Sequence, residues 1–389
     1  MRYRVLLVIT VLVVSLSGGG TATAVTGSAG IDTHTTDVSG AEATTTPSWN
    51  TSSCSFPITV SDATGRNVTI SEEPDRIVTL APSAAQTMWE IGAKEKVIGL
   101  SKHASYLAGA DSRTVVSASG DSFVSVETVY SLQPDLVLAP DIVSNETVER
   151  LRELGLTVYK FEQPHSIEGI QSKTLLTGRL VGACSGARET VTWMNSRLAT
   201  VREATKDTDR PRTLYVFFGY VAGSNTFIHD VIRTAGGTNV AARANNTGFY
   251  QISEEIVVTA DPQWIVVNDG ATQIPNSAAY NRTTAVKKGH IVVLDEEHIS
   301  QPAPRIVHAV VNLTKALHPV AYRQAANVTH TQSTAPADTT TTTTAATPAP
   351  TDTVSSPSPT TTSSTPGFGI VGAIIGVVVA ILVATREYH

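Results

Sequence analysis

The sequence predicts an α/β fold of two lobes joined by one long helix, with a ligand cleft between the lobes. Strand-like and helix-like segments alternate on both sides of residues 166–207, which is typical of a mainly parallel sheet. Within residues 166–207 the apolar residues recur mostly every three or four positions, as in a helix. One short motif occurs on each side of this helix, which indicates two similar lobes.

The length and net charge of the chain indicate how many domains it can form and which partners are consistent with it. Its 389 residues are enough for two domains and tails. The net charge of −6 is mild and no long basic run occurs, which argues against nucleic acid as a partner. We divide the folded part into an N-terminal lobe at 56–165, a linker helix at 166–207 and a C-terminal lobe at 208–322, and we expect a monomer.

The N-terminus has the pattern of a secretory signal peptide over residues 1–24. Arg2 and Arg4 precede an apolar run, and small residues at 22–24 offer a cleavage site. A retained anchor helix is the alternative, but the run is short for a membrane span. Residues 25–55 are poor in apolar residues and rich in Thr and Ser, so we expect a flexible segment.

The elements of both lobes follow from the same alternation. A β-hairpin is predicted first, with strands at 58–60 and 68–70 around a turn at 62–65. The N-terminal lobe continues with strands at 76–80, 97–100, 113–116, 135–139 and 156–161, and with helices at 84–91, 124–132 and 145–154. The C-terminal lobe has strands at 212–217, 263–267 and 291–294, and helices at 226–235, 253–259, 277–286 and 305–317.

Residues 166–207 are predicted as one continuous helix. Ser166 can cap its first turn, and a proline follows its end. Roughly 40 residues at 1.5 Å per residue give a rod of about 60 Å, enough to cross between two domains. Gly178, Gly182 and Gly186 are the places where this helix can bend or break.

A weak repeat relates the two halves. Glu127 and Glu255 each lie near the start of a predicted helix, seven residues before Pro134 and Pro262. A predicted strand follows each proline directly. The matching helix and strand around each Glu and Pro argue against a chance repeat and in favour of two similar lobes.

Cys54 and Cys184 are the two cysteines of the chain. In an exported protein an even count favours a disulfide, and the alternative is two separate thiols, with Cys184 a small core residue of the helix. Seven Asn-x-Ser/Thr sequons fit a glycosylated, exported surface. They lie at Asn50, Asn67, Asn145, Asn245, Asn281, Asn312 and Asn327.

A stalk rich in Thr, Ser and Pro is predicted at 323–365, because such a composition cannot bury a core. At 366–389, Pro366-Gly367-Phe368 precedes an apolar run and Arg386. This order resembles the PGF-CTERM sorting signal of archaeal surface proteins, which implies that an archaeosortase removes the helix and that a lipid anchors the new end. A plain C-terminal transmembrane helix is the alternative. Either arrangement holds the protein on the extracellular face of the cell membrane.

Catalytic motifs were sought and not found. The sequence has no G-x-S-x-G elbow, P-loop, H-E-x-x-H or C-x-x-C. The histidines are dispersed, and no two lie at metal-ligand spacing on a clear helix face. We therefore expect neither an enzyme nor a metal or cofactor site, but a binding protein with its ligand between two lobes.

Residues 76–86 read Arg-Ile-Val-Thr-Leu-Ala-Pro-Ser-Ala-Ala-Gln and continue to Trp-Glu-Ile-Gly-Ala at 89–93. This opening resembles that of the cobalamin and iron-siderophore substrate-binding proteins of ABC importers. Further matches follow in the same order at 125–139, 234–239, 253–267 and 301–305, so the resemblance covers about 74–319.

The resemblance implies two Rossmann-like lobes on one long helix with little hinge bending. It also implies that Glu127 and Glu255 dock onto arginines of the permease dimer, which works with its ATPase. Two charges at a fixed separation suit oriented docking. The alternative is that each Glu is a solvated residue favoured at a helix start.

Candidate ligand residues lie in turns after predicted strands. Pro82 and Ser83 begin a helix, whose N-terminus can offer N–H groups to a polar ligand. The other candidates are His103, Tyr106, Tyr220, Asn225, Tyr250 and His298. Aromatic rings suit a flat corrin or porphyrin.

The ligand class is chosen from the charge of the predicted cleft loops. Lys102 and Arg113 are their main basic residues, whereas anionic iron chelates usually need several. Cobalamin is therefore our first ligand and a ferric siderophore or haem the second. A surface adhesion or structural module is the alternative of another class, and it has no need of the paired Glu motifs.

Overall fold

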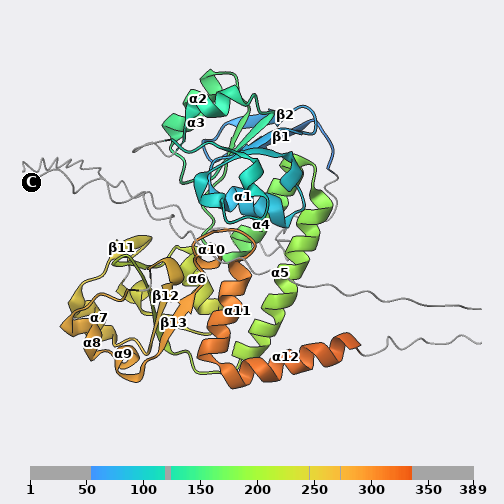
Figure 1. Cartoon of the computed structure of the whole chain (residues 1–389). Coiled ribbons are helices and arrows are strands. Elements are labelled where there is room, and N and C mark those ends of the chain that lie inside the picture. Colours follow the sequence, from blue (N-terminus) through green and yellow to red (C-terminus); the bar gives the residue numbers. More distant parts are fainter. Residues whose placement is uncertain (1–53, 119–123, 245, 272, 335–389) are drawn as a thin grey trace, which may run out of the picture. The chain divides into compact units, whose positions relative to one another are not determined.

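The structure is a computed structural model that describes residues 54–118, 124–244, 246–271 and 273–334 (Figure 1). The predicted signal peptide and sorting signal lie outside these residues, as do nearly all of the segment at 25–55 and the stalk beyond residue 334. The sequons at Asn50 and Asn245 also lie outside them. Among the described helices, none combines the length and the apolar character needed to cross a membrane.

The N-lobe, residues 54–165, is built on a parallel five-stranded sheet in the order β5-β4-β3-β6-β7. Its elements confirm the predicted alternation. The strands are β3 (Ile77–Thr79), β4 (Val97–Leu100), β5 (Thr114–Val115), β6 (Leu136–Ala139) and β7 (Val158–Lys160), and the helices are α1 (Pro82–Glu90), α2 (Val126–Ser131) and α3 (Asn145–Glu153), with short 3₁₀ turns at η2 (Lys94–Lys96), η3 (Lys102–Ala104) and η4 (Ala110–Ser112). The predicted hairpin is also present, as the antiparallel pair β1 (Ile58–Ser61) and β2 (Asn67–Ile70).

The C-lobe, residues 212–334, has a mixed sheet in the order β11-β9-β8-β12-β13, with β10 paired to β8. The strands β8, β10, β12 and β13 pair in parallel, whereas β9 and β11 are antiparallel additions that the sequence did not predict. The strands are β8 (Arg212–Phe217), β9 (Tyr220–Ala222), β10 (Thr238–Asn239), β11 (Phe249–Gln251), β12 (Trp264–Asn268) and β13 (Ile291–Leu294). The helices are α6 (Phe227–Thr234), α7 (Glu254–Ala260), α8 (Ala278–Arg282), α9 (Thr284–Lys288), α10 (Glu296–Ile299), α11 (Ile306–Leu317) and α12 (Pro319–Thr334), with 3₁₀ turns η5 (Val240–Ala244) and η6 (Asp269–Ala271).

Two boundaries of the C-lobe were predicted wrongly. The single helix expected at 277–286 is two helices, because Thr283 leaves the helical conformation and its side chain caps the second one, α9. The stalk was expected from residue 323, but α12 continues to Thr334. This helix packs on α5 and α11, and its Ala325 is buried. The small and polar residues from 323 onward had predicted a stalk because their composition does not show this packing.

The long helix predicted at 166–207 is the main correction. It is two helices, α4 (Ile167–Val181) and α5 (Cys184–Thr205), separated by Gly182 in the left-handed conformation at φ +79°. A left-handed residue ends a helix, and glycine adopts this conformation without steric cost. The second helix begins at Cys184, directly after its N-cap residue Ala183, and runs in a different direction. The apolar spacing therefore continues across a break between two helices.

The helices α4 and α5 pack against each other as a hairpin. A Cβ placed on Gly178 would lie 2.4 Å from that of Ala187, so this glycine permits the close approach. Further along, Gln171 Nε2 donates to Asn195 Oδ1 at 3.0 Å. The pairing of 178 with 187 and of 171 with 195 shows that the two helices run in opposite directions.

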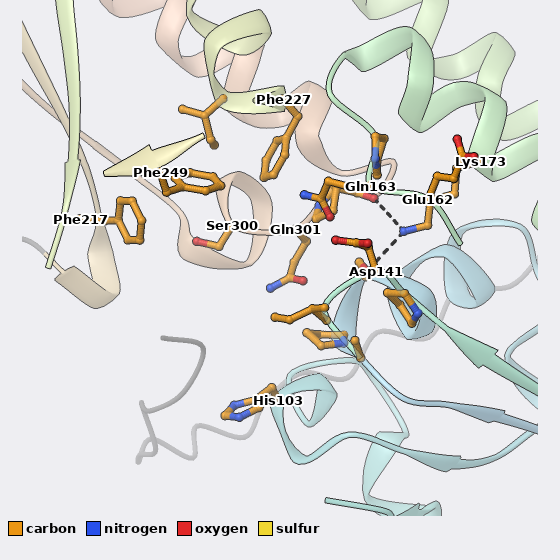
Figure 2. A pocket seen from close by; sticks show the side chains of 18 of the residues that line it. His103, Asp141, Glu162, Gln163, Lys173, Phe217, Phe227, Phe249, Ser300 and Gln301 are labelled. Carbon is orange, nitrogen blue, oxygen red and sulfur yellow. Dashed lines mark hydrogen bonds between the residues drawn. The ribbon is translucent and has the colours of Figure 1, made fainter. Parts of the chain in front are cut away.

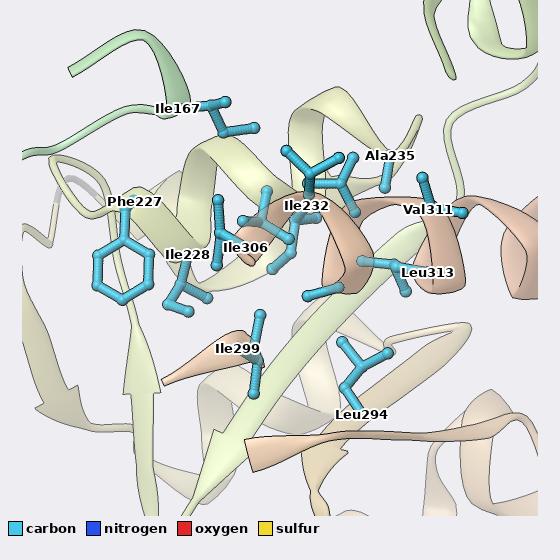
Figure 3. Close-up of a cluster of buried hydrophobic side chains, with 14 of the residues drawn as sticks. Ile167, Phe227, Ile228, Ile232, Ala235, Leu294, Ile299, Ile306, Val311 and Leu313 are labelled. Carbon is cyan, nitrogen blue, oxygen red and sulfur yellow. The ribbon is translucent and has the colours of Figure 1, made fainter. Parts of the chain in front are cut away.

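Both ends of this hairpin belong to lobe cores. The start of α4 and the end of α5 pack into the C-lobe core, where Ile167 lies near Phe227, Ile228 and Ile306 (Figure 3). The end of α4 and the start of α5 pack into the N-lobe core through Leu180, Val181 and Ala187. Each lobe core therefore contains residues from both α4 and α5.

The predicted disulfide between Cys54 and Cys184 is present, with the two Cα atoms 5.8 Å apart. It joins residues 130 positions apart at the first residue of α5. The start of the N-lobe is thus covalently attached to the turn of the helical hairpin.

Candidate ligand-binding cleft

A cavity of about 220 Å³ lies between the two lobes (Figure 2). Residues of the N-lobe, of the C-lobe and of α4 contribute to its wall. They are Ala81, Pro82, Ser83, His103, Pro140, Asp141, Ile142, Glu162, Gln163, Pro164, Lys173, Tyr215, Phe217, Phe227, Ile228, Phe249, Ser300, Gln301 and Pro302.

The N-lobe wall is made by loops that follow the parallel strands. Residues 81–83 follow β3, His103 follows β4, residues 140–142 follow β6, and residues 162–164 follow β7. The carboxyl ends of parallel strands meet at one edge of a sheet, and ligands of such sheets bind at that edge. The topology therefore gathers short segments of distant sequence into one wall.

The C-lobe wall is aromatic. Phe217 ends β8, Phe249 begins β11 and Phe227 begins α6. The rings of Phe217 and Phe249 meet edge to face with centroids 5.4 Å apart, and Phe217 stacks on Tyr215 at 5.5 Å. Figure 2 shows the labelled phenylalanines together on one side of the cavity. This side presents an apolar, rigid surface to a ligand.

The opposite side of the cavity carries charge. Lys173 projects from α4 and is only 7% exposed, and its Nζ donates to Ser83 Oγ and to Pro302 O, both at 3.4 Å (Figure 2). Burial lowers the pKa of Lys173 to about 8, against a smaller opposite effect of Asp141. Asp141 and Glu162 line the same side. The cleft thus has an aromatic face and a charged face.

Hydrogen bonds hold the lobes together beside the cavity. Gln86 on α1 donates from Nε2 to Glu297 O at 3.0 Å, and its Oε1 accepts from Arg305 N at 3.2 Å. Arg305 Nε also donates to Glu90 Oε1 at 2.8 Å. These bonds fix α1 of the N-lobe against the segment before α11 of the C-lobe.

Three of the predicted ligand residues, Pro82, Ser83 and His103, line the cavity. Two of the predicted tyrosines have structural hydrogen bonds instead. Tyr106 Oη accepts from Gln86 Nε2 at 2.8 Å, and burial raises the pKa of this phenol. Tyr250 Oη donates to Ala241 O at 2.7 Å.

The remaining predicted ligand residues are also absent from the wall. Tyr220 packs beside Phe217 with ring centroids 6.0 Å apart, and Asn225 is exposed in a turn at φ +58°. The ring of His298 lies 4.9 Å from that of His308, and burial lowers the pKa of both. None of these three residues is among those that line the cavity.

Sequence reasoning missed the three phenylalanines and Lys173. Phe217 ends a predicted strand, so the strand-end rule that selected His103 also applied to it. Phe249 and Phe227 reach the cavity through the pairing of β9 with β11 and the placement of α6, which no local pattern encodes. Lys173 was one of several polar residues on a predicted helix, with no signal that it would be buried.

Glu127 and Glu255 occupy equivalent positions at the surface. Each is the second residue of its helix, α2 or α7, and each is exposed. Ser125 and Ser253 cap these helices by accepting from the N–H three residues on. None of the ion pairs formed among the described residues includes either carboxylate.

The repeat extends to an arginine at the start of the sheet in each lobe. Arg76 directly precedes β3, and Arg212 is the first residue of β8. Arg76 donates to the carbonyl oxygens of Leu132 and Gln133, at the end of α2. Arg212 donates to those of Ala260 and Asp261, at the end of α7. Gln133 and Asp261 both have positive φ before a proline. The two Glu-bearing helices are therefore fixed to their sheets by the same device.

Among the described residues, no three His, Cys, Asp or Glu side chains are arranged to hold a metal ion.

Comparison with known proteins gives consistent results. The model of the periplasmic binding protein family matches residues 77–298. A protein of Halobacterium salinarum named cobalamin-binding protein is 45% identical over 278 residues, covering 68% of this chain and 75% of its own. The vitamin B12-binding protein of Yersinia pestis is 24% identical, covering 62% and 86%. The solved structure of the periplasmic haem-binding protein RhuT from Roseiflexus sp. RS-1 is 25% identical, with a TM-score of 0.58 over 64% of this chain and 99% of that one.

Proposed function

Because the chain belongs to the periplasmic binding protein family, we propose that it is a cell-surface substrate-binding protein that captures cobalamin and delivers it to an ABC importer. The cobalamin-binding relative at 45% identity supports this ligand. The proposal makes the protein a carrier of a small molecule and not an enzyme.

The aromatic wall of the cavity carries the proposal. Phe217, Phe227 and Phe249 present ring faces and edges on one side of a cleft between two lobes. Such a surface suits the flat, largely apolar ring of a corrin. The same wall would suit a porphyrin, and the structural similarity to a haem-binding protein makes haem the second candidate, with a ferric siderophore behind it.

Delivery requires a surface that the permease recognises. We assign this role to Glu127 and Glu255, because both are exposed, equivalent and fixed on helices attached to rigid sheets. A permease dimer with its ATPase offers two similar contacts, which a repeat in two lobes can match. Export through the segment at 1–24 and anchoring through 366–389 would keep the protein beside this partner.

Ligand titration of the purified full chain tests the proposal. We expect cyanocobalamin to raise the melting temperature and change the cobalamin absorbance, with haem and a ferric siderophore as the comparison ligands. Ligand at a hundredfold its dissociation constant stabilises the folded state by about 2.7 kcal/mol. A response to haem alone would mean that the ligand is a porphyrin and not a corrinoid. No response to any of the three compounds would contradict a role in their transport.

The phenylalanines give a sharper prediction. Phe249→Ala and Phe217→Ala should each weaken binding of cyanocobalamin by about 1.5–3 kcal/mol, because each removes an aromatic ring of the cavity wall that the bound ligand would cover. Phe218→Ala is the matched control, since Phe218 is about as exposed as Phe249, at 49% against 40%, but does not line the cavity. Isothermal titration calorimetry measures the three affinities. Equal losses in all three variants would mean that the aromatic wall does not bind the ligand.

A further inference from the structure

The ammonium group of Lys173 is buried beside the cavity, and burial is the main influence on its pKa. Its side chain lies in the cavity wall, its two hydrogen bonds are long, and none of the ion pairs among the described residues includes it. Its other close neighbour is the ring of Phe161, 5.5 Å from Nζ. Asp141 of the same wall favours the charged form of Lys173, but burial outweighs this effect and lowers the pKa of the ammonium group. Because burying a charge is costly, further negative charge beside Nζ would stabilise the ammonium group.

The N-terminus of α1 lies at the same part of the wall. Ala81 stands at its N-cap position and provides no side-chain hydrogen bond, and Pro82 and Ser83 follow. An uncapped helix N-terminus carries partial positive charge and attracts anions. Ser83 joins the two features, because its Oγ accepts from Lys173 while its backbone belongs to the first turn of α1.

The other charged residues that line the cavity are carboxylates, which suit hydrogen-bond donors of a ligand. Among the described residues that line the cavity, Lys173 is the only Lys or Arg. Asp141 and Glu162 can accept hydrogen bonds and are suited to amide donors, which a corrin carries around its rim. The two carboxylates and the ammonium group thus call for a ligand with both amide groups and one anionic group.

We propose that Lys173, together with the N-terminus of α1, forms a subsite for an oxyanion of the ligand, and that this oxyanion is the phosphodiester of a complete cobalamin. This inference rests on the proposed function and extends it, because it distinguishes complete cobalamin from corrinoids that lack the nucleotide. A free phosphate ion has the same chemistry and is separated from it by the test.

The test compares two corrinoids and three proteins. Cyanocobalamin contains the phosphodiester, whereas dicyanocobinamide lacks it together with the nucleotide base. We expect Lys173→Met in the full chain to weaken cyanocobalamin binding about tenfold to a hundredfold, as for a lost hydrogen bond to a charged group. Dicyanocobinamide binding should change by less than about threefold, since neither partner of the lost contact is then present.

Lys102→Met is the matched control, because Lys102 is exposed and precedes His103 of the cavity wall. It should leave both affinities nearly unchanged. An equal loss for both corrinoids in Lys173→Met, or no loss for either, would overturn the inference while leaving cobalamin binding itself intact. Failure of the unaltered protein to bind cyanocobalamin would instead contradict the proposed function.

A measurement on the unaltered protein covers the case in which Lys173→Met does not fold. Cyanocobalamin affinity should fall as the pH rises above about 8, because Lys173 is charged below its pKa and neutral above it. The other ionisable groups of the wall are Asp141, Glu162, His103 and Tyr215, and burial raises the pKa of this tyrosine. Between pH 7 and 10 dicyanocobinamide affinity should stay constant, and a parallel fall for both corrinoids would overturn the inference.

Inorganic phosphate separates the two sources of the anion. Millimolar phosphate should compete with cyanocobalamin only weakly, because the phosphodiester is held in place by the rest of the bound ligand. Strong competition in the unaltered protein that is lost in Lys173→Met would mean that the subsite serves a free anion.

Discussion

Replacement of both Glu127 and Glu255 by lysine is expected to abolish cobalamin uptake while leaving cobalamin affinity unchanged. Both carboxylates are exposed on helices outside the cavity wall, so the ligand does not contact them. Reversal of two charges at a docking surface replaces attraction by repulsion, which slows association and weakens the complex. Uptake of labelled cobalamin by cells that carry the importer, beside calorimetry on the purified variant, measures the two effects.

The control for this experiment is the double variant Glu146→Lys with Glu254→Lys. Glu146 is exposed and is the second residue of α3, as Glu127 is of α2, and Glu254 directly precedes Glu255. The control makes the same change in net charge at helix starts outside the repeat positions. Normal uptake in the Glu127 and Glu255 variant would refute the docking role, and lost affinity would show that the residues support the cleft instead.

Replacement of Asp62 by alanine is expected to lower the free energy of unfolding by about 3–5 kcal/mol, the usual effect of removing one partner of a buried ion pair. The Asp62 side chain is fully buried and that of Arg152 is 6% exposed. Asp62 also accepts from the backbone and hydroxyl of Thr64 and from the backbone of Lys160. The carboxylate thereby connects the β1–β2 hairpin to α3 and β7.

The pH dependence of this stabilisation follows from the pKa of Asp62. Burial opposes ionisation, but hydrogen bonds from Thr64, Arg152 and Lys160 outweigh it and lower the pKa below 3.8. A lowered folded-state pKa stabilises fully above the unfolded pKa of about 3.9, and this contribution is lost as the pH falls through the folded value. The difference between the unaltered protein and Asp62→Ala should therefore narrow below about pH 4.

Denaturant unfolding at pH 7 and pH 3 measures both effects. Glu203→Gln is the control, because it removes an exposed ion pair with Lys206, and solvent-exposed ion pairs contribute little to stability. A loss below about 1 kcal/mol in Asp62→Ala would mean that water replaces the carboxylate without cost.

The alternation of strands and helices could be predicted from the sequence because each element carries its own period. The break at Gly182 could not, because α4 and α5 share one apolar stripe and a single left-handed residue does not change the pattern. The residues of the cleft likewise divide into those that a local sequence pattern predicts and those that depend on contacts between distant segments. Ser83 and His103 follow predicted strands and were found, whereas Phe249 depends on the pairing of β11 with β9, between segments distant in sequence.

The helical hairpin also has a consequence for how the carrier is emptied. Although the linker is broken at Gly182, α4 and α5 cross from one lobe core to the other in opposite directions and pack against each other. Opening the cleft would require both helices to slide or to leave a core. We therefore expect spontaneous unloading to be slow, so that contact with the importer, acting on both lobes at once, sets the rate at which the cargo leaves.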